Sequence, residues 1–269
     1  VLDSAMGRIG EHELQFSIGV GGMGRVYQAV SPGGKTVAIK LIDTENNSDY
    51  RKLDRFIDEY ELLSQVDHPH VKQVHDQGFS DSHVYIVMEL LTGGTLKSKI
   101  NQGLDIEEAL KLSVHISHAL ATIHDLDILH RDIKPTNILF DENDQPVITD
   151  FGLAKIADSR KDVELTIQGE AIGTPAYMSP EQVLGHKVTE KADQYAFGVM
   201  LYYMLTGKLP FAAKSPISMM QKHLDTPAPH LPADLVDIDP VVHRLLEKQP
   251  DKRFQSTWEL HQALEKFEM

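Results

Sequence analysis

The sequence predicts an α+β protein with a strand-rich N-terminal third and a mainly helical remainder. In the first part, the apolar runs 26–30 and 36–40 flank Ser31-Pro32-Gly33-Gly34, which is typical of two strands joined by a turn. In the second part, the segments 105–127 and 189–207 have the length and end residues of helices. Because 269 residues exceed the usual size of one compact core, we expect one large domain or two lobes with a cleft between them.

Capping residues delimit the two expected helices. Asp105-Ile106-Glu107-Glu108 has the form of a capping box at the start of the first helix. Thr189 supplies an N-cap for the second helix and Gly207 a C-terminal stop. The apolar run 196–205 in the second helix is far shorter than the roughly 20 residues that span a bilayer.

Composition excludes several classes of function. Hydrophobic residues make up 41% of the chain and charged residues 25%, which is typical of a globular protein rather than a disordered one. The formal net charge of -14 argues against general nucleic-acid or anionic-membrane binding, because those partners need clustered Lys and Arg, whereas it suits basic peptides. The absence of Cys excludes disulfides, thiolate metal sites and a Cys nucleophile. Residues 1–13 contain no apolar core of signal-peptide length, so we expect a soluble, cytoplasmic fragment without membrane contact.

A glycine-rich segment precedes the first expected strand, and it reads Ile18-Gly19-Val20-Gly21-Gly22-Met23-Gly24. Its Gly-x-Gly-x-x-Gly pattern is weak evidence alone, because dinucleotide-binding folds place the same pattern at the start of a helix. Here the pattern leads into a strand. Glycines let the backbone lie close to phosphates and point N–H groups at them, so we interpret the segment as a lid over a nucleotide, with Val26 and Ala38 enclosing an adenine ring.

Two short strings lie thirteen positions apart, counted from Asn137 to Asp150: His130-Arg131-Asp132-Ile133-Lys134-Pro135-Thr136-Asn137 and Asp150-Phe151-Gly152. They offer a carboxylate to orient a hydroxyl, a Lys for phosphate oxygens, and amide and carboxylate oxygens for Mg²⁺, which prefers oxygen ligands. With these strings, the chain from about residue 14 to residue 267 resembles a protein kinase of the eukaryotic type, and it is similar to bacterial receptor-like Ser/Thr kinases.

The resemblance implies a two-lobe kinase fold. It implies a small antiparallel sheet with one helix in residues 1–89, a mainly helical lobe in residues 90–269, and ATP between them. It further implies transfer of the γ-phosphoryl group of Mg-ATP to Ser or Thr hydroxyls of protein substrates, with Mn²⁺ as an alternative metal. Relatives in bacteria are often followed by a membrane span, so an anchored parent protein is compatible with this reading.

The resemblance assigns roles to the charged residues. Asp132 would orient the substrate hydroxyl and Lys134 would stabilise the transferring group. Lys40, at the end of an apolar strand where an unpaired charge is costly, would meet the α- and β-phosphates and a carboxylate. Glu59 is the preferred carboxylate and Glu61 the second choice; for both, a solvated helix charge is the alternative.

Further positions complete the expected nucleotide site. Met88 would be the gatekeeper behind the adenine pocket, although an ordinary core Met explains it as well. The Glu89 carbonyl and the Leu91 amide would bind the adenine edge, and Leu139 belongs to the same set. Asn137 and Asp150 would hold Mg²⁺, while His130 would be structural, packing with Phe151, Leu63 and Val74.

Regulatory positions follow from the same resemblance. The presence of Thr174 and Lys134 at these positions resembles the pattern of Ser/Thr-specific rather than Tyr-specific kinases. Arg131 is a cation beside the site, and a phosphate on the activation loop is the anion expected to meet it. Thr166 is the expected autophosphorylation position, while Gln168 occupies the second position that relatives often phosphorylate; an ordinary exposed loop Thr is the alternative for Thr166.

Scaffold positions are also expected. Glu181 should pair with Arg253, or else both are exposed charges. Asp193 should accept backbone N–H groups of the catalytic loop, and Tyr195 stands where the family usually has Trp.

Other functions stay open at this point. A pseudokinase that binds nucleotide or partners without turnover and a small-molecule phosphotransferase are the two alternatives to an active protein kinase. The four retained residues Lys40, Asp132, Asn137 and Asp150 disfavour the first of these. A zinc pair formed by His115 and His118 is disfavoured, because no further ligand motif accompanies it. A homodimer that phosphorylates in trans is compatible with the sequence, but no feature demands it.

Overall fold

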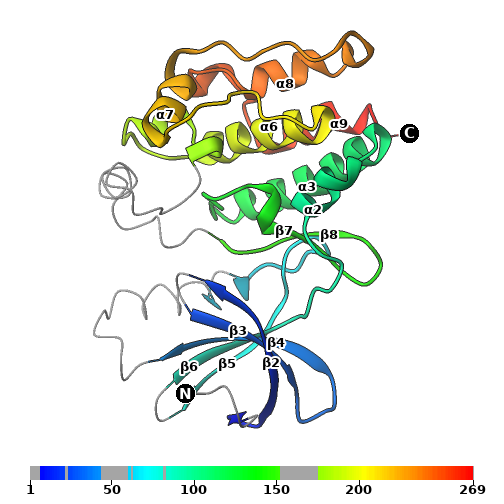
Figure 1. Ribbon diagram of the computed structural model, residues 1–269, viewed down its shortest axis with the longest axis vertical. Coiled ribbons are helices and arrows are strands. Elements are labelled where there is room, and N and C mark those ends of the chain that lie inside the picture. The colour runs from blue at the N-terminus through cyan, green and yellow to red at the C-terminus, as the bar shows by residue number, and fades with distance from the viewer. Residues whose placement is uncertain are drawn as a thin grey trace. The chain divides into compact units, whose positions relative to one another are not determined.

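The computed structural model describes residues 7–21, 24–43, 60–61, 63–80, 83–151 and 175–268 (Figure 1). The chain divides into two compact units. Unit 1 contains Val1–Gly93 with Asp141–Gln145, and unit 2 contains Gly94–Phe140 with Pro146–Met269. Within the described residues, unit 1 is built on a sheet and unit 2 mainly on helices, which confirms the predicted α+β, two-lobe fold class.

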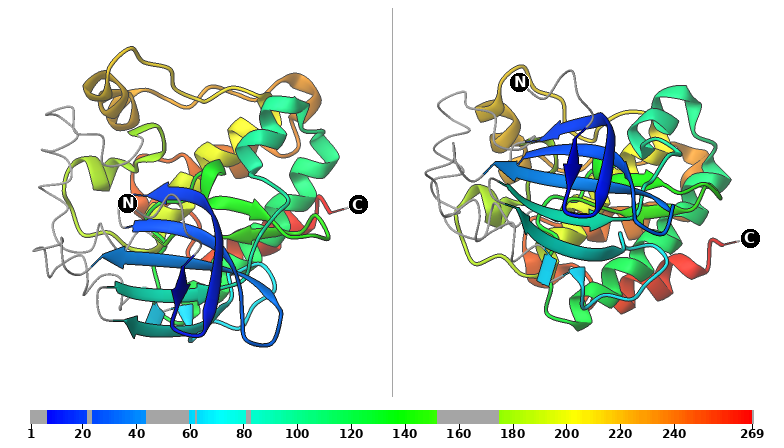
Figure 2. Two further views of the ribbon diagram at one scale, coloured as in Figure 1. Left: turned by 60° about the horizontal axis from the view of Figure 1, so that its bottom comes forward. Right: turned by 90° about the horizontal axis from the view of Figure 1, so that it is seen from below.

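Unit 1 contains a six-stranded antiparallel sheet in the order β1-β2-β3-β4-β6-β5, whose strands lie side by side in Figure 2. The strands are β1 Arg8–Ile9, β2 His12–Gly21, β3 Gly24–Val30, β4 Thr36–Asp43, β5 Val74–Ser80 and β6 His83–Met88. The glycine-rich segment therefore joins two paired strands, with Gly21 opposite Gly24, and does not open a helix. The pattern therefore leads into a strand, as predicted, and the predicted strand–turn–strand order follows it, because β3 and β4 pair across the turn at residues 31–34.

Gly24 is required by close backbone packing. Its φ is +150°, and a Cβ atom there would lie 2.0 Å from the Leu41 carbonyl oxygen of β4. A Cβ at Gly19, by contrast, would meet nothing within 4 Å. The two glycines thus serve different purposes, because Gly24 lets β3 approach β4 whereas Gly19 leaves open space over the strand.

Alternation along the strands gives the sheet two different faces. One face holds a cluster of nine buried residues: Ile9, Leu14, Tyr27, Ala29, Val37, Ile39, Leu41, Tyr85 and Val87. The other face holds Ala38, Ile42, Val84, Ile86 and Met88, against which Val26, Tyr60, Val74 and Leu90 pack. The predicted adenine-contacting side chains belong to this second face.

Unit 2 contains seven α-helices within the described residues, together with the hairpin of β7 Ile138–Phe140 and β8 Pro146–Ile148. The helices are α2 Leu96–Gly103, α3 Ile106–Asp125, α5 Pro180–Val183, α6 Glu190–Thr206, α7 Pro216–Asp225, α8 Asp239–Leu245 and α9 Thr257–Glu265. The hairpin follows a short 3₁₀ helix at Pro135–Asn137, and α3 packs against α6 and α9.

The predicted caps are partly confirmed. Thr189 accepts a hydrogen bond from the Lys191 amide, and Gly207 ends α6 in the left-handed conformation with a φ of 68°. Asp105 stands at the N-cap of α3 but its side chain makes no capping hydrogen bond, so the predicted capping box is wrong. The reason is local competition, because the Glu108 carboxylate pairs instead with Lys99, 2.9 Å away.

The apolar run 196–205 is buried within α6. Among the described residues, no helix has both the length and the apolar character needed to cross a membrane.

Candidate active site

The first of the two predicted catalytic strings, residues 130–137, forms a compact loop in unit 2 that ends in the 3₁₀ helix Pro135–Asn137. The Lys134 Nζ donates to Asp132 Oδ2 at 2.7 Å. The side-chain nitrogen Nδ2 of Asn137 donates both to the Asp132 carbonyl oxygen at 2.9 Å and to Asp132 Oδ2 at 3.0 Å. Two side chains, a cation and an amide donor, therefore converge on the Asp132 carboxylate and fix its orientation.

Two residues of the catalytic strings adopt backbone conformations that most side chains avoid. Arg131 has a φ of 65° and Asp150 a φ of 56°. A non-glycine residue in this region costs about 1–3 kcal/mol, and such residues persist only where the surrounding structure enforces them. At Arg131 the enforcing group is Asp193 of α6, whose two carboxylate oxygens accept the backbone amides of His130 at 2.8 Å and Arg131 at 2.7 Å.

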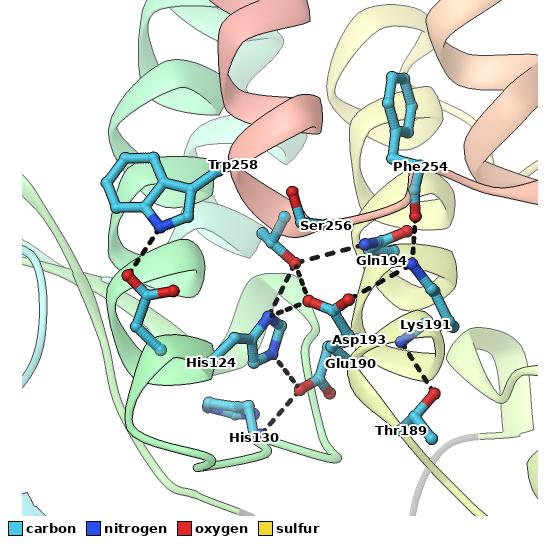
Figure 3. Close-up of polar contacts among 12 residues, drawn as sticks. His124, His130, Thr189, Glu190, Lys191, Asp193, Gln194, Phe254, Ser256 and Trp258 are labelled. Carbon is cyan, nitrogen blue, oxygen red and sulfur yellow. Dashed lines mark hydrogen bonds and ion pairs between the residues drawn. The ribbon is translucent and has the colours of Figure 1, made fainter.

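The Asp193 carboxylate is itself supported by a histidine that the sequence reasoning missed (Figure 3). The His124 Nε2 lies 2.9 Å from Asp193 Oδ2, and its Nδ1 lies 2.8 Å from the Thr257 hydroxyl of α9. Burial alone would raise the pKa of Asp193, but the hydrogen bond and charge of His124 and the contacts with His130 hold it below its ordinary value. A carboxylate that stays ionised is the stronger acceptor for the two loop amides.

A signal for His124 was present in the sequence. His124 lies in the last turn of α3, six positions before His130, where a partly buried histidine at the end of a helix needs a polar partner. The partner, Asp193, lies 69 positions further along the chain, so only the tertiary structure identifies it.

His130 is structural, as predicted. Its side chain is fully buried, its Nε2 lies 2.9 Å from the Thr149 carbonyl oxygen, and its ring is 4.7 Å from the ring of Phe151. Burial lowers the pKa of His130, although Asp193 and the Thr149 carbonyl oppose this shift. The ring therefore links the two strings, through the Thr149 carbonyl on one side and the Phe151 ring on the other. The predicted partners Leu63 and Val74 belong to unit 1, where Leu63 is buried and Val74 packs against the second sheet face.

The residues predicted to hold Mg²⁺ provide suitable donors. The side-chain nitrogen Nδ2 of Asn137 donates to Asp132. The side-chain oxygen Oδ1 is therefore the atom of Asn137 that can bind a cation. Asp150 is exposed, and its Oδ2 receives a bond of 3.4 Å from the Thr149 hydroxyl. An amide oxygen and a carboxylate are hard ligands of the kind that Mg²⁺ prefers, so this donor set fits the predicted metal.

In unit 1, the predicted nucleotide residues share one sheet face. Lys40 stands opposite Val26 on β3 and Ile86 on β6, and Ala38 stands opposite Met88. Val26, Ala38, Lys40 and Met88 therefore point to the same side of the sheet, the side of the second hydrophobic cluster.

In the segment after β6, some backbone groups make hydrogen bonds within the protein and others do not. The Glu89 amide donates to the Gln73 carbonyl, and the Glu89 carboxylate accepts the Gln73 amide at 2.7 Å. Burial, the largest influence, raises the pKa of Glu89 despite that hydrogen bond. Among the described residues, no backbone hydrogen bond uses the Glu89 carbonyl oxygen or the Leu91 amide, the two groups predicted to bind an adenine edge. Leu139 lies in β7 of unit 2 and is partly buried.

Several predicted site residues lie outside the described residues: Gly22, Met23, Glu59, Thr166 and Thr174. Ile18, Gly19, Val20 and Gly21 lie on β2, of which the last two are described only by their backbone. Glu61 is exposed, and its carbonyl oxygen accepts the side chains of Ser64 and Gln65.

The predicted pair of Glu181 and Arg253 is confirmed. The guanidinium makes two parallel hydrogen bonds to the carboxylate, of 2.6 Å and 2.9 Å, and the Arg253 side chain is completely buried. Three backbone carbonyls, those of Lys191, Glu247 and Lys248, accept its remaining donors. The charge is thus fully compensated, which a buried Arg requires.

Comparison with known proteins agrees with this geometry. A family model described as "Protein kinase domain" matches residues 12–266. The chain is 37% identical over 259 residues to the serine/threonine-protein kinase PknA of Mycobacterium tuberculosis, covering 92% of this chain and 59% of the relative. It is 38% identical over 268 residues to pkn2 of Myxococcus xanthus (95% and 32% covered) and 35% identical over 254 residues to PrkC of Bacillus subtilis (92% and 39% covered).

The chain spans only about a third to three-fifths of the length of these relatives. The family match nevertheless extends over nearly all of this chain. The chain belongs to the protein kinase domain family.

Proposed function

We propose that this chain is a protein Ser/Thr kinase that transfers the γ-phosphoryl group of Mg-ATP to hydroxyl groups of protein substrates. The observation that carries the proposal is the Asp132 carboxylate, whose Oδ2 accepts hydrogen bonds from both Lys134 and Asn137, at 2.7 Å and 3.0 Å. The names of the relatives support Ser and Thr as acceptors. A pseudokinase has no need for such a preorganised carboxylate, so turnover is the better proposal.

In the proposed reaction, Asp132 orients the acceptor hydroxyl and receives its proton as the hydroxyl oxygen bonds to the γ-phosphorus. The bond between that phosphorus and the oxygen bridging to the β-phosphate breaks, and ADP leaves. Lys134 lies 2.7 Å from Asp132, where its ammonium can meet the oxygens of the transferring group. Asn137 and Asp150 would hold Mg²⁺, which when bound neutralises charge on the phosphate oxygens.

We propose nucleotide contacts for unit 1 in the same way. Val26, Ala38 and Met88 would contact the adenine ring, and Lys40 would bind the α- and β-phosphates with Glu59 as its carboxylate partner. The shared sheet face of the first three residues and Lys40 supports this assignment. Residues 1–89 would form the nucleotide-binding lobe and residues 90–269 the catalytic and substrate lobe of one kinase domain.

The experiment is incubation of the purified chain with Mg²⁺ and radiolabelled ATP, followed by measurement of incorporated phosphate. We expect incorporation by the wild type and its loss in Lys40→Met and in Asp150→Asn. Lys35→Met and Asp234→Asn are matched controls, because both residues are exposed charges outside the proposed site. Undiminished incorporation in the first two variants would contradict the mechanism, and tight ATP binding without incorporation by the wild type would favour a pseudokinase.

Phosphosite mapping by mass spectrometry tests the regulatory part of the proposal. We expect Thr166 to be phosphorylated and Thr166→Ala to lower phosphorylation of an added peptide, since a phosphate there would add an anion that the Arg131 cation can bind. A rate that rises with the square of enzyme concentration would indicate phosphorylation in trans between two copies. Phosphate confined to other positions would contradict the role of Thr166 while leaving the kinase activity intact.

A further inference from the structure

Three metal-ligating side chains converge at the start of α8 in unit 2. They are His230 in the loop before the helix, Asp239 at the first position of α8, and His243 one turn later. One ligand atom from each residue lies within 4.8 Å of the other two. None of the three belongs to the proposed phosphoryl-transfer site.

The sequence and local fold explain why these atoms meet. Residues four apart on a helix lie on one face, which brings His243 above Asp239. The Asp239 Oδ1 accepts the Leu231 backbone amide at 2.8 Å, and this bond holds the preceding loop against the helix start. As a result His230 Nδ1 lies 2.7 Å from Asp239 Oδ2, and the rings of His230 and His243 stack with centroids 4.3 Å apart.

The distances suit a tetrahedral ion. Ligand atoms about 2.0–2.1 Å from Zn²⁺ are separated by roughly 3.3 Å when the geometry is tetrahedral. The two measured separations, 2.7 Å from His230 Nδ1 to Asp239 Oδ2 and 3.6 Å from His243 Nε2 to Asp239 Oδ1, lie on either side of that value. The two separations involve different oxygens of Asp239, so an ion would be held by both carboxylate oxygens, or by one of them after a side-chain rotation, with ligand atoms that already lie within 4.8 Å of one another.

One ligand atom lacks a hydrogen-bond partner. The His243 Nε2 is buried and makes no hydrogen bond to the described residues, and its separation of 3.6 Å from Asp239 Oδ1 is too long to count as one. A buried polar atom without a partner is unfavourable, and a bound ion would remove that cost. The His230 side chain, in contrast, is 80% exposed, which gives an ion a route from solvent.

We propose that His230, Asp239 and His243 bind a divalent transition-metal ion such as Zn²⁺. Two imidazoles and one carboxylate are ligands that Zn²⁺ accepts, and water would take the fourth position. The hard ion Mg²⁺ prefers oxygen ligands and would not compete at this mixed set. Bound metal would link the loop that carries His230 to α8, so the expected consequence is added stability of this part of unit 2.

The test is a Zn²⁺ titration of the chelator-treated, nucleotide-free chain by calorimetry, with thermal unfolding in parallel. We compare the wild type with His230→Ala and His243→Gln; His186→Gln is the matched control, because His186 is an exposed histidine outside the cluster. Loss of even an outer-shell partner typically weakens metal binding about 10- to 100-fold, so loss of a ligand is expected to weaken it at least about tenfold. Using two variants guards against the chance that one of them misfolds.

We expect the wild type and His186→Gln to bind one equivalent of Zn²⁺ that both ligand variants lose. Bound Zn²⁺ should raise the unfolding temperature, and EDTA should reverse that rise. Cobalt substitution gives a second readout, since tetrahedral Co²⁺ has a visible spectrum that both ligand variants should lack. Equal stoichiometry and affinity in all four proteins, or no binding to the wild type, would overturn the proposal. Neither result depends on kinase activity.

Discussion

At the scale of single residues, the conformation of Arg131 depends on one carboxylate. Its φ of 65° is unfavourable for a residue with a Cβ atom, and the amide bond to Asp193 Oδ1 at 2.7 Å stabilises it. The neighbouring His130 amide uses the other oxygen of Asp193, so both amides before Asp132 are fixed by α6. The position of Asp132 is therefore set by a side chain that need not contact any substrate.

We predict that Asp193→Asn lowers both stability and activity. The variant keeps the volume but replaces a charged acceptor, and hydrogen bonds to charged groups contribute about 1.5–3 kcal/mol each. We expect the free energy of unfolding to fall by at least about 1.5 kcal/mol in urea denaturation. We also expect kcat to fall by at least about tenfold with a smaller change in the KM for ATP, because a misplaced Asp132 weakens positioning.

Asp125→Asn is the control for this prediction. Asp125 lies at the end of α3 and accepts the Trp258 indole N–H at 2.7 Å, but it is exposed and bonds to no loop amide. Its replacement should leave kcat unchanged. If Asp193→Asn were as active as Asp125→Asn, the proposed positioning role of Asp193 would be wrong.

At the scale of elements, α6 and α7 are joined by a buried polar contact. The Tyr195 hydroxyl lies 2.9 Å from His223 Nδ1, and the His223 ring packs edge-on against the rings of Tyr195 and Phe211. Lys248 lies above the Tyr195 and Phe211 rings, 5.7 Å and 4.3 Å from their centroids. Tyr195 stands where the family usually has Trp, and the structure adds that its hydroxyl bonds to His223.

This contact predicts a loss of stability in acid. Burial, and then the charge of Lys248, lower the pKa of His223 from 6.5 to about 4, although the Ala176 carbonyl opposes the shift. Between these values the unfolded chain binds a proton that the folded chain does not, so the free energy of unfolding falls as the pH drops. The full effect of His223 is of the order of 3 kcal/mol and is complete near pH 4.

Chemical denaturation of the wild type and His223→Gln from pH 7 to pH 4 measures this effect. Gln keeps an acceptor for the Tyr195 hydroxyl but has no titrating group, so its stability should depend less steeply on pH. The difference between the two proteins removes the contribution of other histidines, including the buried His130. Parallel curves for the two proteins would show that His223 does not carry the effect.

At the scale of the whole molecule, the formal net charge of -14 favours the binding of positively charged partners over negatively charged ones. If the proposed kinase activity holds, we predict that a Ser peptide flanked by Lys and Arg has a lower KM than the same peptide flanked by Glu and Asp. The preference should shrink between 0.01 M and 0.15 M ionic strength, where the screening length falls from about 30 Å to about 8 Å. Steady-state kinetics at both salt concentrations would measure it, and equal KM values at low salt would contradict it.

The sequence by itself determined the fold class and the positions of the chemical groups. Alternation along β4 already put Ala38 and Lys40 on one face, and the spacing of Asp132, Lys134 and Asn137 within six residues already placed them in one loop. Both results depend on interactions that are local in the chain. Local patterns also mislead where a competitor is near, as Asp105 shows, because Lys99 took the Glu108 that its capping box required.

The tertiary structure decided the contacts between residues that are far apart in the chain. His124 reaches Asp193 across 69 positions, Tyr195 reaches His223 across 28, and the loop histidine His230 meets α8 at Asp239. No local pattern encodes such pairs, because the free energy of a buried polar contact depends on which groups the fold leaves beside it. The groups of the loop 130–137 and its support by Asp193 were therefore predicted from the sequence and its resemblance, whereas His124, the side chain behind Asp193, became visible only in the folded chain.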